Sequence, residues 1–234
     1  LELTLGTASD DTVNAGLSGA TLTVKAQSGA LDGGDVLTGG TGLSDELQIT
    51  DITGNTSLDG MTAFEKVTVV PNYNGSLTIT AADSNVAAGA TLTVTGSNNI
   101  PFFTTGALVF DGSLETDGKF VVTSGYGNDS ITTGTGADLI TSGEGNDTVL
   151  SGTGNDTVNA GGGDDSVIGD LGNDSIDGGA GNDYLAGDLA VADPTLGGND
   201  TINAGSGADG IFGGLGADTI NVGAGDGAVD TLYY

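Results

Sequence analysis

The chain has 234 residues, of which 32 are acidic and only three are basic, giving a formal net charge of -29 at pH 7. Such a charge makes nucleic acids and anionic lipids poor partners. Because there is no cysteine and no histidine, disulfides, thiolate metal sites and imidazole ligands are excluded as well. Hydrophobic residues make up 36% of the chain, which is compatible with a folded protein. The carboxylates therefore point to hard cations that bind through oxygen.

The first 123 residues are expected to form short β-strands. Apolar and polar residues alternate, with many Thr and β-branched side chains, at 20–26, 64–70, 76–81 and 90–96, which predicts half-buried strands. The more continuously apolar runs at 107–110 and 119–123 predict strands buried on both sides or at a junction. Two glycine-rich phrases, at 6–14 and 39–49, place Asp11 and Asp45 ahead of an aliphatic residue. No segment has a helical period, so we expect an all-β protein.

From Ser124 to Asn221 a nine-residue phrase of glycine, aspartate and one aliphatic residue recurs with little drift. Glycines at its second and fourth positions permit sharp turns, because glycine adopts backbone conformations that side chains forbid. The sixth position is an aspartate. The eighth position is an aliphatic side chain expected to point inward: Ile131, Ile140, Val149, Val158, Val167, Ile176, Leu185, Ile202, Ile211 and Ile220. Two units make one coil of 18 residues, so successive turns are expected to stack in two rows.

This phrase resembles the G-G-x-G-x-D-x-U-x repeat of the RTX family, which implies a right-handed parallel β-roll that binds Ca²⁺ between successive turns. Carried over by position, the resemblance implies two rows of ligating aspartates. One row is Asp129, Asp147, Asp165, Asp183 and Asp209, and the other is Asp138, Asp156, Asp174, Asp200 and Asp218. Asp230, Asp11 and Asp45 are further candidate ligands outside the regular units. A merely acidic surface, as in a salt-adapted protein, has no reason to place aspartate every nine residues behind Gly-x-Gly.

These patterns divide the chain into two parts. Residues 1–123 are expected to form a Thr-rich β domain that is solenoid-like or sandwich-like, and residues 124–234 the RTX calcium β-roll. The boundary near Ser124 is soft, because strands of the first part can stack directly onto the first turn of the array. Residues 189–196 interrupt the repeats, and the strand phase is kept if this insertion bulges from the turn before Asp200.

The outward positions of the array predict two unlike faces. Positions seven and nine of alternate units share a face. One face is mostly Thr, Ser and Asn, whereas the other carries an apolar stripe of Leu150, Ile168, Tyr184, Ala186 and Phe212. Either the insertion or the first domain covers this stripe, or the stripe mediates lateral association between copies.

The order of the glycine-rich and Thr-rich phrases in residues 1–70 resembles the opening of RTX-type surface-layer proteins. We therefore expect a non-enzymatic extracellular structural protein, a surface-layer, matrix or filament subunit, exported by a bacterial type I route. Self-association is the expected partnership, and a cell-surface polysaccharide is a further candidate partner. No catalytic constellation is present, and no apolar run reaches the roughly 18 residues of a membrane span. The alternative is a calcium-dependent folding and export module of a secreted enzyme or adhesin.

Folding of the array is expected to require Ca²⁺, since like charges would otherwise face each other around a thin core. Extracellular sites of this kind bind at about 10⁻⁴ to 10⁻³ M, so folding would follow export to a calcium-rich exterior. Circular dichroism should show high β content in millimolar Ca²⁺ and much less in excess EDTA. Equal β content under the two conditions would contradict the expectation.

Overall fold

The computed structural model describes residues 2–4, 12–14, 23–27, 36–38, 45–50, 54–57, 61–62, 64–69, 77–82, 86, 89–95, 106–189, 197–223 and 228–233. All the strands in these ranges pair in parallel, and the strands lie in three sheets. Among the described residues there is no helix long and apolar enough to cross a membrane. The all-β parallel roll expected from the sequence is confirmed.

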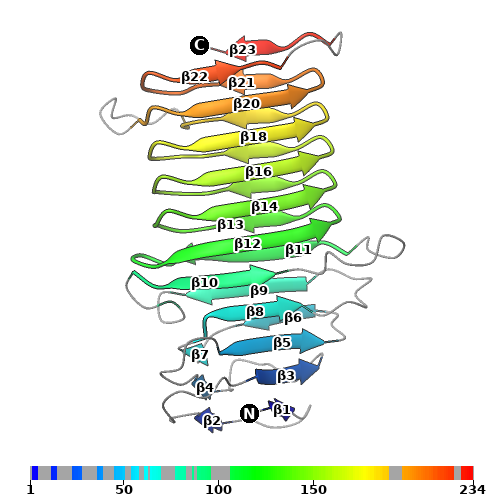
Figure 1. Cartoon of the computed structure of the whole chain (residues 1–234), viewed down its shortest axis with the longest axis vertical. Coiled ribbons are helices and arrows are strands. Elements are labelled where there is room, and N and C mark those ends of the chain that lie inside the picture. The colour runs from blue at the N-terminus through cyan, green and yellow to red at the C-terminus, as the bar shows by residue number, and fades with distance from the viewer. Residues whose placement is uncertain are drawn as a thin grey trace.

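The largest sheet has 11 strands and runs the length of the molecule (Figure 1). In spatial order its strands are β1 (Glu2–Thr4), β3 (Thr23–Gln27), β5 (Glu46–Thr50), β8 (Lys66–Val69), β10 (Thr91–Thr95), β12 (Lys119–Tyr126), β14 (Leu139–Glu144), β16 (Thr157–Gly162), β18 (Ser175–Ala180), β20 (Thr201–Ser206) and β22 (Thr219–Asn221).

A second sheet of nine strands forms the opposite wall of the roll. It contains β6 (Gly54–Ser57), β9 (Leu77–Ala82), β11 (Leu108–Leu114), β13 (Ser130–Thr132), β15 (Thr148–Leu150), β17 (Ser166–Ile168), β19 (Tyr184–Ala186), β21 (Gly210–Phe212) and β23 (Thr231–Tyr233). A small third sheet lies near the N-terminal end and contains β2 (Thr12–Asn14), β4 (Val36–Thr38) and β7 (Met61–Thr62).

Residues 18 apart pair across neighbouring strands throughout the regular part of the array. Ile140, for example, pairs with Val158 and Val158 with Ile176, so each coil lies directly on the one before it. The ladder continues across the expected boundary at Ser124, because β12 contains this residue and pairs with both β10 and β14. In the described residues the first part of the chain is therefore solenoid-like, and its division from the array as a separate domain stays a prediction.

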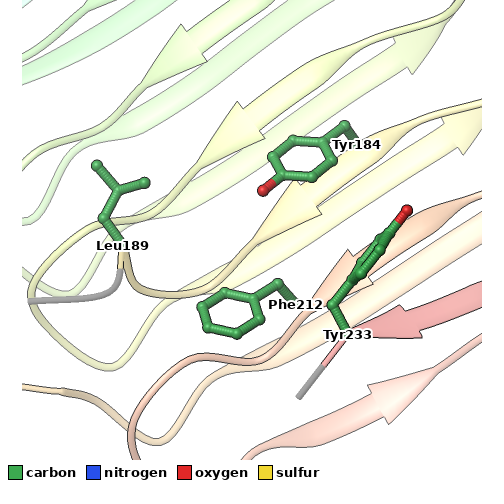
Figure 2. Close-up of a pocket in the computed structure, with 4 residues that line it drawn as sticks. All are labelled: Tyr184, Leu189, Phe212 and Tyr233. Carbon is green, nitrogen blue, oxygen red and sulfur yellow. The ribbon is translucent and has the colours of Figure 1, made fainter.

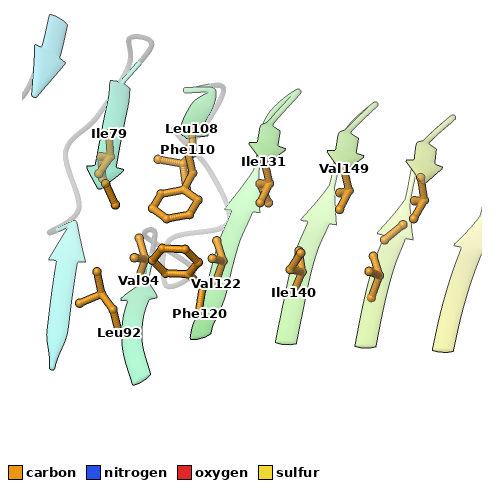
Figure 3. Close-up of a cluster of buried hydrophobic side chains, with 14 of the residues drawn as sticks. Ile79, Leu92, Val94, Leu108, Phe110, Phe120, Val122, Ile131, Ile140 and Val149 are labelled. Atoms are coloured by element: carbon orange, nitrogen blue, oxygen red, sulfur yellow. The ribbon is translucent and has the colours of Figure 1, made fainter. Parts of the chain in front are cut away.

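Inward side chains from the two large sheets meet in one column of apolar contacts (Figure 3). All ten eighth-position residues lie in this column, and nine of them are at most 1% exposed, with Ile220 partly buried at the end. The rings of Phe110 and Phe120 pack edge to face with their centroids 5.1 Å apart, an arrangement that aromatic pairs prefer. The column is wider here than in the array, where one aliphatic side chain per unit supplies most of the core.

Strands β11 and β12 alternate between buried and half-buried residues over most of their length, because one face of each sheet turns outward. Of the two settings expected for these runs, burial on both sides is wrong, whereas β12 lies at the expected junction because it contains Ser124. In the array, strands of the larger sheet such as β14 span six residues, whereas strands of the opposite sheet such as β13 span three. The longer strands extend into the first three positions of the next unit, so each of them buries a second residue. In β14 this second residue is Ser142.

The glycines of the turns are required for two reasons, which Gly161 and Gly163 illustrate. Their φ angles are 106° and 123°, in a region that side chains rarely adopt. In addition, a Cβ atom on Gly161 would collide with the carbonyl oxygen of Gly143 in the preceding coil. Neighbouring Gly162 has neither constraint, since its added Cβ would meet only the flexible carboxylate of Glu144.

The pair Gly161 and Gly162 therefore provides a matched test of coil stacking. In saturating Ca²⁺, Gly161→Ala should lower the free energy of unfolding in urea by more than about 1 kcal/mol, because of positive φ and backbone contact. Gly162→Ala should change it much less. Equal losses for the two variants would show that the stacked backbone does not impose the glycine.

Candidate metal centres

Each row of turns carries a ladder of aspartates joined from coil to coil. Row A contains Asp129, Asp147, Asp165, Asp183 and Asp209, and row B contains Asp138, Asp156, Asp174, Asp200 and Asp218. Within each row the backbone N–H of one aspartate donates to Oδ1 of the next, at 2.8–3.0 Å. The structure thus confirms the two rows predicted from the 18-residue coil, and it carries both rows across the interruption after Leu189.

The second oxygen of these carboxylates is buried against the next turn. In the described part of the chain, Oδ2 has no hydrogen-bond partner in Asp129, Asp138, Asp147, Asp156, Asp165, Asp174, Asp183 and Asp200. The side chains concerned are at most 3% exposed. A buried carboxylate oxygen without a partner is costly, so each of these atoms indicates a place for a cation.

Glycines at the first position of a unit leave room for such a cation. A Cβ atom on Gly178 would lie 2.7 Å from Oδ2 of Asp183 and 2.6 Å from the carbonyl oxygen of Ala204 in the next coil. Likewise, a Cβ on Gly213 would lie 2.6 Å from Oδ2 of Asp218. Carboxylate and carbonyl oxygens therefore converge on space that a side chain would fill.

This donor set fits Ca²⁺. No group of three or more acidic side chains that could hold a metal occurs within the described ranges, so backbone carbonyls and water must complete each coordination shell. Ca²⁺ accepts six to eight oxygen ligands of these kinds in flexible geometry, whereas softer metals prefer nitrogen or sulfur. When bound, the ions supply the positive charge that the stacked carboxylates lack.

Four of the first positions carry a hydroxyl in place of glycine, and each hydroxyl links two coils. Ser124, Thr133, Ser142 and Ser151 donate to the carbonyl oxygens of Ser142, Ser151, Ala160 and Gly169, at 2.6–3.0 Å. These bonds satisfy carbonyls that would otherwise lie unpaired at the turn. The N-terminal coils of the array are therefore joined by hydroxyl bridges as well as by their strands.

Burial raises the pKa of the eight row aspartates from Asp129 to Asp200 above that of an exposed carboxyl. It raises the pKa of Asp129, Asp147, Asp165, Asp183 and Asp200 to about 6, and that of Asp156 and Asp174 to about 7. Except at Asp129, neighbouring carboxylates raise these pKa values further, while backbone hydrogen bonds lower them. Without metal the folded roll therefore holds protons that the unfolded chain releases.

The other candidate ligands lie in different settings. Oδ1 of Asp230 accepts from the backbone N–H of Asp209 at 3.1 Å, which extends row A by one coil. Asp45 is buried before β5, and its backbone N–H donates to Oε2 of Glu65 at 2.7 Å. The strand register places Asp45 in line with row B, four coils before Asp138. Asp11 lies outside the described residues. That each candidate aspartate binds Ca²⁺ stays a prediction.

The structure also reveals buried carboxylates that the repeat pattern did not single out. Asp188 is 0% exposed, and its Oδ2 accepts from the backbone N–H groups of Gly198 and Leu215 at 3.1 and 3.2 Å, both of which follow the interruption. Asp170, in the same position one coil earlier, is half-buried and is the one described non-glycine residue with positive φ, at 71°. Glu115 is 1% exposed and precedes the array by one coil. No regular spacing locates Glu115, because the pairing offset changes from 21 residues at Asp111 to 18 at Val121.

Comparison with known proteins agrees with this geometry. Residues 123–158, 159–189 and 195–229 match the family described as RTX calcium-binding nonapeptide repeat (4 copies). No curated protein and no solved structure matches the chain significantly. RTX nonapeptide repeats bind several Ca²⁺ ions per array.

The raised pKa values predict how metal-free stability depends on pH. Between the ordinary aspartate pKa of about 4 and the folded values of about 6 to 7, the folded state binds more protons than the unfolded state. In EDTA, the melting temperature should therefore fall as pH rises from 5 to 7.5. In saturating Ca²⁺ the fall should be absent, because ions replace the protons. A metal-free melting temperature that is constant or rises over this interval would contradict the prediction.

Proposed function

Because residues 123–158, 159–189 and 195–229 are RTX calcium-binding nonapeptide repeats, we propose that the chain is a non-enzymatic structural protein of the bacterial exterior. It serves as a surface-layer, matrix or filament subunit whose folding and assembly depend on Ca²⁺. RTX repeats are structural calcium-binding modules that are typically found in secreted bacterial proteins. The stacked array makes the subunit rod-shaped, and this rod forms when calcium binds.

The continuity of the sheets is the observation that carries this proposal. The larger sheet contains strands from β1 to β22, and the opposite sheet contains strands from β6 to β23 (Figure 1). The described residues thus form one extended stack, with the Thr-rich strands joined to the calcium-binding coils in the same ladder. An elongated body with a regular surface suits repeated side-by-side packing.

One face of the rod offers an apolar surface for such packing. Tyr184, Leu189, Phe212 and Tyr233 line an open hollow of about 530 Å³ beside β19, β21 and β23 (Figure 2). Tyr184, Leu189 and Tyr233 are 45%, 43% and 52% exposed. We name these four residues the aromatic patch. Among the described residues its lining includes no charged side chain, so these residues can approach another copy without desolvating a carboxylate.

The aromatic patch shares Tyr184 and Phe212 with the stripe expected from sequence, whereas Leu150 and Ile168 are half-buried and do not line the hollow. Ala186 is 0% exposed and does not contribute to the surface. It pairs with Ile168 on one side and Phe212 on the other, so larger neighbours cover its methyl group. Leu189, where the interruption begins, joins the surface in its place.

A second copy of the chain is the occupant that this patch favours. A net charge of -29 makes copies repel one another, and bound Ca²⁺ lowers that repulsion while ordering the strands that display the patch. Calcium therefore acts on assembly through both charge and folding. The alternative is a folding and export module whose enzyme or adhesin partner lies in other residues, and such a module would stay monomeric in calcium.

Matched aspartate substitutions test the assembly proposal. Tyr184→Asp combined with Tyr233→Asp should abolish calcium-dependent assembly, measured by sedimentation velocity and electron microscopy, with an unchanged circular dichroism spectrum. Leu139→Asp is the control, because Leu139 is also 45% exposed but lies on the larger sheet.

The parent chain and the control are expected to form ordered sheets or filaments in millimolar Ca²⁺ and to dissociate in EDTA. Monodisperse rods from the parent chain would favour the export module instead. Assembly that survives the double substitution would remove the aromatic patch as the interface.

A further inference from the structure

The coil that precedes the repeats has a longer turn with different residues. Asp111 pairs with Thr132 and Val121 pairs with Leu139, so residues 112–120 lie opposite residues 133–138 and contain three more residues. The backbone N–H of Phe120 donates to Oδ1 of Asp138 at 2.7 Å, as aspartates do in later coils. Phe120 therefore stands where the repeats have their sixth-position aspartate, and Glu115 lies within the longer turn before it.

Glu115 is held rigidly in this turn and leaves one oxygen without a partner. Its Oε1 accepts from the backbone N–H groups of Thr116, Asp117 and Gly118 at 3.2, 3.1 and 2.7 Å. The side chain is 1% exposed, and Oε2 is buried with no hydrogen-bond partner in the described part of the chain. Three backbone donors fix the carboxylate, so Oε2 cannot turn away to solvent without breaking them.

Glu115 lies against the turn at the start of the array. Its carbonyl oxygen accepts from the backbone N–H of Thr135 at 3.1 Å, and a Cβ atom on Gly134 would collide with the same oxygen. Oδ2 of Asp138, in that turn, is a second buried carboxylate oxygen without a hydrogen-bond partner in the described part of the chain. Two buried carboxylates in one pair of turns require a cation or a proton to neutralise them.

We propose that Glu115 and Asp138 hold a Ca²⁺ ion between the turns 115–120 and 133–138, one coil before the family repeats begin. Glu115 supplies, from within the longer turn, the charge that Phe120 cannot supply from the sixth position. The site has two carboxylates, like each pair of neighbouring aspartates in the rows, and carbonyl oxygens and water complete the shell. Burial is the main cause that raises the pKa of Asp138, and the negative charge of Glu115 raises it further.

Such an ion has a structural consequence beyond the array. Strands β11 and β12 join the turn of Glu115 to the Thr-rich strands β9 and β10. A calcium ion bound there ties the first part of the solenoid to the repeats, so that ordering of the array is transmitted to the strands before it. The inference rests on calcium binding by the array but not on assembly, and it is tested on the monomer.

Ion counting on paired variants tests the site. Glu115→Gln keeps an acceptor for the three backbone donors and removes the negative charge that would hold the ion. Asp117→Asn is the matched control, because Asp117 is exposed in the same turn and the charge change is identical. In equilibrium dialysis with ⁴⁵Ca²⁺, Glu115→Gln should bind one ion fewer per chain than the parent, and Asp117→Asn the same number as the parent.

An unchanged ion number in Glu115→Gln, or an equal loss in Asp117→Asn, would overturn the inference. Failure of the parent chain to bind Ca²⁺ at all would instead contradict the proposed function, so the two failures are distinguishable.

A second measurement does not depend on the folding of a variant. In crystals of the parent chain grown in Ca²⁺, an anomalous difference peak should lie 2.3–2.6 Å from Oε2 of Glu115 and from a carboxylate oxygen of Asp138. Peaks along both rows without one at Glu115 would overturn the inference. A protonated Glu115 carboxyl in calcium-saturated solution would also overturn the inference, because the proton would then take the place of the ion. The carboxyl can be observed by ¹³C NMR, since the chain has five glutamates and their signals can be assigned.

Discussion

Along each turn row, the backbone N–H of one aspartate donates to the carboxylate of the aspartate in the next coil. The same carboxylates are buried, and most leave their second oxygen unpaired. This arrangement aligns the coils, but it also stacks negative charges in a space with little water. Folding therefore depends on neutralisation, by protons at low pH or by Ca²⁺ at neutral pH. The thin apolar column cannot compensate for the repulsion, since it receives about one large side chain per unit.

In the turns, glycine permits a close approach of neighbouring coils, and calcium binding depends on the same close approach. Carbonyl oxygens of one coil lie so close to the glycines of the next that an added Cβ atom would collide with them. The close approach brings carboxylate and carbonyl oxygens within reach of a common ion. Where a hydroxyl replaces the first glycine, as in Ser142, it links the coils by a hydrogen bond to a carbonyl. Glycine thus sets the spacing of the backbone, whereas hydroxyls and cations satisfy the remaining acceptors.

Repetition made much of this predictable. The expected strands at 64–70, 76–81 and 90–96 correspond to β8, β9 and β10, because alternation of apolar and β-branched residues directly reflects a half-buried strand. The two aspartate rows followed from a coil of 18 residues. The exposure of Ala186 was not predictable from its position in the unit, since it depends on the size of Ile168 and Phe212 in the neighbouring strands.

The sequence by itself determined the parallel roll, the inward aliphatic residues and the identity of the stacked aspartates, because each depends on a short local period that recurs without drift. Only the tertiary structure decided which carboxylates outside the nine-residue phrase lie against neighbouring coils. Glu115 and Asp188 have no place in the nine-residue phrase, yet the register buries both against the rows. Their surroundings include residues far apart in the chain, as when Oδ2 of Asp188 accepts from Leu215, 27 positions later. A local repeat carries no information about such contacts.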